Sequence, residues 1–107
     1  MVDFDTWQKL DLRLGRVIEA EAHPKADKLL VLKVDLGKEQ RQLVAGLREY
    51  YRPEELVGKT VVVLANFEPR KLRGIWSQGM VLAGVEEGGE VGLITCDKQL
   101  KPGTKVS

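Results

Sequence analysis

The chain has 107 residues, the length of one small domain, so we expect a single domain over residues 1–107. Hydrophobic residues make up 43% of the chain, enough for a modest core, and 17 basic against 16 acidic side chains give a formal net charge of +1. This balance excludes a basic tail and an acidic disordered segment, so any binding of nucleic acid has to come from a local patch.

The cysteine count and the N-terminal residues narrow the class further. Cys96 is the only cysteine, which excludes an internal disulfide and a zinc site built from several cysteines. The first residues lack the basic region and apolar run of a signal peptide, and no stretch approaches the roughly 20 apolar residues of a membrane span. We expect a cytoplasmic protein with no membrane association, no metal and no cofactor.

A long first strand is predicted from Asp11 to Ala22, where apolar and polar residues alternate. Gly15 and Val17 interrupt the alternation, and a bulge or sharp bend is expected there. The face expected to point inward carries Leu12, Leu14, Ile18, Ala20 and Ala22.

Two further strands are predicted after a polar loop at residues 23–28. Residues 29–36 form the second strand and residues 40–45 the third, joined by a hairpin turn at 37–39. The inner face of the second strand is expected to carry Leu30, Leu32, Val34 and Leu36.

The second half predicts one short helix and more strands. Residues 53–56 have a proline and two acids at a helix start, and residues 60–67 contain a β-branched run typical of a buried strand. Residues 79–85 and 90–96 predict two strands around a turn, followed by a C-terminal extension. Five or six strands with a helix between the third and fourth indicate an all-β, five-stranded OB-fold barrel. An SH3-like barrel is the alternative, which the bent first strand and the helix disfavour.

No catalytic constellation is present at motif spacing. His23 is the only histidine and precedes a proline in a loop, where a local hydrogen bond is the expected role. No glycine-rich phosphate loop occurs either. We therefore expect no enzymatic activity, and a hydrolase that uses His23 remains the alternative from another class.

The segment "ANFEPRKLRGIWSQGM", residues 65–80, holds three basic residues and one acid, so it carries +2 in a chain of +1. Pro69 and Gly74 are expected to bracket an exposed basic loop with Arg70, Lys71 and Arg73, suited to phosphates. Trp76 and Met80 offer surface for contact with a base, and Ser77 and Gln78 offer donors and acceptors. The alternative is a solvated loop with Trp76 in the core.

A second basic group is formed by Lys25, Lys28 and Lys33, with Arg41 expected opposite on the third strand. Basic pairs across strands are unfavourable unless they are solvated or matched by an anion. From these residues alone, a solubilising outer face is the simpler interpretation.

The motifs "HPKADKL", "LKVDLG", "LVAGL", "ANFEPRKLRGI", "SQGM" and "KPGTKV" resemble one family along nearly the whole chain. It is the tRNA-binding OB-fold domain found at the C-terminus of methionyl-tRNA synthetases and as small free-standing proteins. The resemblance implies a homodimer that recognises tRNA by shape, without catalysis of its own, either free-standing or joined to the catalytic region of a methionyl-tRNA synthetase.

The resemblance also implies particular site residues. The RNA-binding candidates that match its motifs are Asn66, Lys71, Arg73, Ser77, Met80, Lys25 and Lys28. Trp76 occupies a position that the family leaves variable. The dimer-interface candidates are Phe4, Trp7, Leu10 and the tail from Leu100 to Val106. CsaA-like secretion chaperones share the fold and the dimer and are the alternative, ranked second because this chain keeps "HPKADKL" and "SQGM".

Overall fold

The computed structural model describes all 107 residues, as nine strands and two short helices. In chain order these are α1 (Phe4–Gln8), β1 (Leu12–Ala22), β2 (Leu30–Asp35), β3 (Gln40–Ala45), α2 (Pro53–Leu56), β4 (Thr60–Leu64), β5 (Arg70–Leu72), β6 (Ile75–Ser77), β7 (Met80–Val81), β8 (Ala83–Val85) and β9 (Val91–Leu93).

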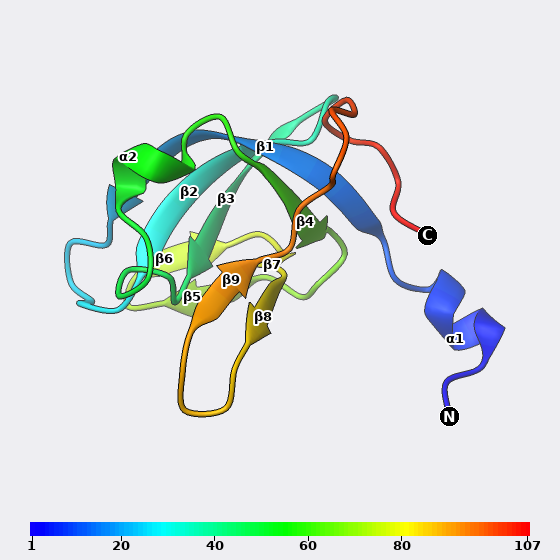
Figure 1. Cartoon of the computed structure of the whole chain (residues 1–107), viewed down its shortest axis with the longest axis horizontal. Helices are drawn as coiled ribbons and strands as arrows, with labels where there is room; N and C mark the ends of the chain where they lie inside the picture. The colour runs from blue at the N-terminus through cyan, green and yellow to red at the C-terminus, as the bar shows by residue number, and fades with distance from the viewer.

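Five strands curl into a nearly closed barrel (Figure 1). They lie in the order β3-β2-β1-β4-β7, and all neighbours are antiparallel. The remaining gap beside β3 is bridged by hydrogen bonds from the Val44 N–H to Ser77 Oγ (2.9 Å) and from the Gln78 N–H to the Gln42 carbonyl (2.8 Å). With α2 between β3 and β4, this confirms the predicted OB-fold layout.

The core confirms the predicted inner face of β2. Leu30, Leu32, Val34 and Leu36 are all buried in one cluster. Leu56 of α2 is completely buried in the same cluster. Pro53 at the start of α2 and the Glu55 side chain, which accepts from the Arg52 N–H (2.9 Å), hold this single turn in place.

The predicted face of β1 is wrong in part, although its bulge is confirmed between Val17 and Glu19. Val17 lies in the barrel core and Ile18 is exposed, the reverse of the expectation. Leu12 and Leu14 are buried on the outside of the barrel, in a second cluster with Val62 of β4. Two apolar faces on one strand explain the error, because the outer face is covered by Leu82, Cys96 and Val106 from later in the chain.

Gly15 shows why a residue without a side chain is needed inside β1. A Cβ atom at this position would lie 2.4 Å from Cγ1 of Val34 and 3.0 Å from Cδ2 of Leu36. The side chains of Val34 and Leu36 therefore occupy the space that a Cβ atom at this position would need.

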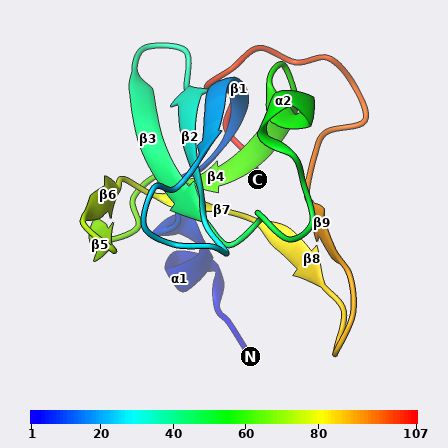
Figure 2. The ribbon, with the colours of Figure 1, turned by 90° about the vertical axis from the view of Figure 1, so that its left-hand side faces the viewer.

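Several predicted elements of the second half differ in the structure. The predicted strand at 60–67 ends at Leu64. The strand expected at 79–85 is divided into β7 and β8, and the strand expected at 90–96 is limited to β9. The chain leaves the barrel at Leu82, and β8 and β9 form an arm that projects from it (Figure 2). The helix α1 was not predicted, and no helix is long and apolar enough to cross a membrane.

Candidate nucleic-acid interface

The basic residues at 70–73 lie on a β-hairpin, which corrects the predicted loop. Strands β5 and β6 pair over three residues each, and the turn between them is Arg73-Gly74. Both turn residues have positive φ, 49° for Arg73 and 91° for Gly74. This conformation matches the twist of a tight hairpin and favours glycine at the second position. We call residues 70–77 the basic hairpin.

The pairing of β5 with β6 assigns the side chains of the basic hairpin to two faces. Lys71 pairs with Trp76, and both side chains are exposed, so the interpretation that put Trp76 in the core is wrong. Arg70 pairs with Ser77 on the other face. Because cross-strand neighbours share a face, one face offers a cation beside an aromatic ring and the other turns toward the barrel.

His23 joins the basic hairpin to the loop between β1 and β2, residues 23–29, which we call the first loop. Its ring is buried, with 2% of the residue surface exposed. Nδ1 accepts from the Lys25 N–H (3.0 Å), and Nε2 lies 3.0 Å from the Leu72 carbonyl oxygen. A carbonyl only accepts, so Nε2 carries the proton and the ring is neutral.

This geometry confirms the local hydrogen bond expected of His23 and adds a long-range one across 49 positions of sequence. Both ring nitrogens are engaged and buried, so nothing supports His23 as the base of a hydrolase. The hydrogen bonds instead fix the first loop against the basic hairpin.

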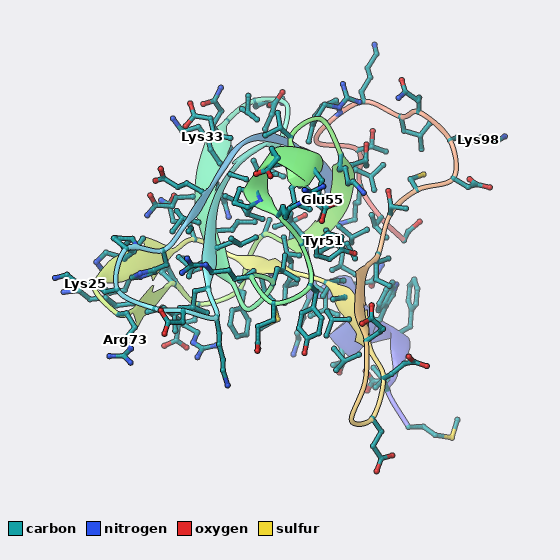
Figure 3. The ribbon with its side chains drawn as sticks, turned by 60° about the vertical axis from the view of Figure 1, so that its left-hand side comes forward. Lys25, Lys33, Tyr51, Glu55, Arg73 and Lys98 are labelled. Carbon is teal, nitrogen blue, oxygen red and sulfur yellow. The ribbon has the colours of Figure 1, made fainter.

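Five exposed cations come together at this end of the molecule: Lys25, Lys28, Arg70, Lys71 and Arg73. The structure contains four ion pairs, and none of them includes any of these five residues. Lys25 and Arg73 extend from the same end of the ribbon in Figure 3. Cations without carboxylate partners are the electrostatic footprint of a site for phosphates.

A hollow of about 580 Å³ lies between the first loop, the basic hairpin and strands β7 to β9. Twelve of its 18 lining residues are hydrophobic, among them Tyr50, Phe67 and Met80. Lys28 and Arg70 are the two basic residues that line it. We call this hollow the apolar groove.

Two predicted RNA contacts are occupied by the fold itself. The Ser77 hydroxyl is buried; it accepts from the Val44 N–H and donates to the Gly79 carbonyl, each at 2.9 Å. The Asn66 side chain accepts from the Asp11 N–H (2.9 Å) and donates to the Lys9 carbonyl (2.6 Å). Ser77 therefore helps to close the barrel and Asn66 holds the link between α1 and β1, so both side chains have a structural role in the fold.

Two members of the second basic group, Lys33 and Arg41, lie away from the five exposed cations. The Lys33 ammonium lies 3.8 Å from a Glu19 carboxylate oxygen on the outer face of the sheet, and Figure 3 shows Lys33 away from Lys25 and Arg73. Arg41 lies opposite Val34 and not opposite Lys33. Its guanidinium donates to Glu39 and to the Ala65 carbonyl, so it supports the fold.

Four of the predicted dimer-interface residues lie close together where α1 meets the C-terminal tail. Phe4, Trp7, Leu10 and Val106 line one shallow hollow of about 200 Å³ between α1 and the tail, whereas Leu100 lies outside it. No residue of α1 is buried. Hydrogen bonding from the Thr6 side chain, and then from its backbone N–H, lowers the pKa of the Asp3 carboxyl at the helix start below its ordinary value of 3.8.

Comparison with known proteins decides the family. Residues 12–105 match the family described as "Putative tRNA binding domain". The chain belongs to this family.

Relatives of this tRNA-binding domain include much longer proteins. The chain is 60% identical to a methionine–tRNA ligase of Pyrococcus abyssi over 105 residues, which are 98% of the chain but only 14% of that protein. Any activity of the remaining part of that protein is a property of the ligase.

Solved structures of similar length have the same fold. A MetRS-related protein from Pyrococcus horikoshii has a TM-score of 0.94 at 36% identity, covering 100% of this chain and 98% of its own. The chaperone CsaA from Bacillus anthracis has a TM-score of 0.91 at 37% identity, with 100% and 99% covered.

Sequence reasoning missed the two features that organise this domain's site. The role of His23 had no signal, because its partner is a backbone carbonyl 49 positions away. The apolar groove draws its lining from segments between Lys28 and Val91, and only the folded barrel brings them together.

Proposed function

We propose that this tRNA-binding domain holds folded tRNA at its basic end, through the first loop and the basic hairpin, and catalyses no reaction itself. The observation that carries the proposal is the set of five unpaired cations on two segments that His23 joins. Cations held in fixed relative positions select a particular arrangement of phosphates, which folded RNA offers and unstructured RNA does not.

The proposed partners follow from the same family. The matched part of the ligase relatives supports a role for the domain beside the catalytic region of a methionyl-tRNA synthetase. The likeness to CsaA supports a second candidate, a chaperone for unfolded polypeptides. The two differ in their ligand: the first requires tRNA binding, and the second requires suppression of the aggregation of an unfolded protein.

We further propose that the domain is a homodimer formed through α1 and the tail. A helix of five residues without a buried side chain has little stability of its own beyond the Asp3 cap and the Asn66 bond to the Lys9 carbonyl. Phe4 and Trp7 are exposed on it, at 68% and 38%, beside Val106. A second copy that covers this apolar surface would stabilise the helix.

The first prediction tests the basic end. The Lys71→Ala, Arg73→Ala double variant should bind every tRNA more weakly, because two cations that face phosphates are removed. The slope of log affinity against log salt should become shallower by roughly 0.7 to 0.9 for each phosphate that is no longer neutralised. Binding curves at several salt concentrations measure both quantities, and the parent should bind folded tRNA more tightly than unstructured RNA of equal length.

The matched control is Lys38→Ala, Lys98→Ala, which removes the same charge. Both lysines are exposed and outside the ion pairs, and Figure 3 shows Lys98 at the opposite side from Arg73. An equal decrease of affinity in the two double variants would mean general charge attraction and would exclude a site at the basic hairpin. Equal affinity for folded and unstructured RNA would exclude recognition of shape.

A further inference from the structure

We infer that the apolar groove receives an unstacked nucleobase of the bound RNA, while Lys28 and Arg70 hold the phosphates on either side of it. This inference rests on the proposed function. It adds a second kind of contact to the basic end, apolar and insensitive to salt.

The size and lining of the apolar groove suit such a ligand. Its volume of about 580 Å³ lies within the range of ligand pockets, about 300–1,000 Å³. Met80 and Tyr50 leave 37% and 38% of their surfaces exposed on its wall. A flat aromatic ring that covers these side chains removes apolar surface from water, which favours binding.

The charges at the apolar groove distinguish a nucleotide from a peptide. Lys28 comes from the first loop and Arg70 from the inner face of the basic hairpin, and neither forms an ion pair. Glu49 is the one acid of the lining, so the charged side chains of the groove sum to +1. A nucleotide within an RNA strand has an apolar ring between two phosphates, so it satisfies the groove and both cations together. An apolar peptide would fill the groove but leave both cations without partners.

The polar groups of the groove leave the face of the base as the main surface of contact. The Ser77 hydroxyl already bonds the Val44 N–H and the Gly79 carbonyl. The Glu49 carboxylate and the Tyr50 hydroxyl are the remaining side-chain groups of the lining that could meet the edge of a base. Recognition of a particular base requires several donors and acceptors directed at its edge, so the preference among bases should be small.

The experiment uses tRNA transcripts in which single unpaired adenosines are replaced, one at a time, by the fluorescent base 2-aminopurine. One position should change its emission when the protein binds, because that base leaves its stack and enters the groove. An abasic nucleotide at this position should weaken binding roughly 5- to 150-fold, whereas exchange for another base should change it less than about threefold.

The protein variants are Met80→Ala and Tyr50→Ala, which should abolish the emission change and weaken binding with an unchanged salt slope. The matched control is Ile18→Ala: Ile18 is 37% exposed like Met80 but does not line the groove. Thermal melts identify a variant that fails to fold. If one of the two groove variants does not fold, the other one tests the inference.

Three outcomes would overturn the inference. If tRNA binds with normal affinity but no position responds and both groove variants behave like Ile18→Ala, the groove is not a base site and the proposed function stands. If no position responds and an apolar peptide binds the parent but not the Met80→Ala variant, the groove serves polypeptides. If the parent protein binds no tRNA, the proposed function fails as well.

Discussion

Single residues at the basic end act mainly by positioning others. His23 is the clearest case, because one neutral ring bonds the backbone of the first loop and the backbone of the basic hairpin. Ser77 does the same between β3 and the chain before β7. The residues proposed to meet RNA and those that hold the surface in shape are therefore different residues, although they are adjacent in the same motifs.

His23 yields a prediction at this scale. In the His23→Asn variant the side-chain oxygen can still accept from the Lys25 N–H, but the bond to the Leu72 carbonyl is removed; His23→Gln can restore a donor toward Leu72. We expect the Asn variant to lose about 1 kcal/mol of unfolding free energy and to bind tRNA more weakly, and the Gln variant to recover most of the affinity.

A double-mutant cycle separates positioning from general destabilisation. In the parent, the effects of Lys25→Ala and Lys71→Ala on tRNA affinity should be coupled, because both cations contact one rigid ligand. The coupling should shrink in the His23→Asn background and return in His23→Gln. Identical coupling in all three backgrounds would show that His23 only contributes to stability.

At the scale of elements, sequence prediction succeeds where the pattern is local. Strands β2 and β3 and the turn of α2 were predicted because alternation, a glycine turn and a proline start lie within a few residues of one another. The basic hairpin was missed because its strands have three residues each and its turn begins with Arg73, the only non-glycine residue with positive φ. The Asp3 cap is the one local signal for α1.

The C-terminal tail is an element whose placement depends on one glycine. Gly103 has φ +89°, and a Cβ there would lie 2.3 Å from the Leu36 carbonyl oxygen. The tail is also held by backbone bonds from Gly103 to the Leu14 carbonyl (2.7 Å) and from Val106 to the Leu12 carbonyl (2.8 Å). Gly103 therefore lets the tail cover the outer cluster of β1.

Gly103→Ala should displace the tail and cost about 1–3 kcal/mol of unfolding free energy, because the overlap is with rigid backbone. Thermal melts measure this decrease, and hydrogen exchange at the Val106 amide reports the release of the tail. Gly92→Ala is the control, since a Cβ there meets nothing within 4 Å. Equal stability of the two variants would contradict this account.

At the scale of the whole molecule, the proposed dimer surface and the basic end lie apart. Light scattering should give about twice the 12.0 kDa chain mass. Trp7→Glu should shift the protein to the monomer without unfolding it, because Trp7 is not buried in the barrel. Trp76→Glu is the matched control, an exposed tryptophan at the basic end that should leave the dimer intact. A monomeric parent at micromolar concentration would contradict the proposal.

The candidate site could be predicted only in part, because some of its contacts form only when the whole barrel closes. Charge excess in residues 65–80 indicated the basic residues of the hairpin but not their strands, because net charge is visible in a short window. Asn66 and Ser77 carry the same donors and acceptors whether they serve RNA or the fold. Their partners, Lys9, Asp11 and Val44, become neighbours only after the barrel closes.

The positions of the two chain ends have a consequence for how the domain works when it is joined to another. In Figure 1 both chain ends lie toward one end of the 39 Å long axis, and the first loop and basic hairpin lie toward the other end. A catalytic unit fused at either end would leave the cations uncovered. The catalytic unit and the cations would belong to one chain. An RNA bound by the cations would therefore remain at a high effective concentration beside the catalytic unit, without any new contact.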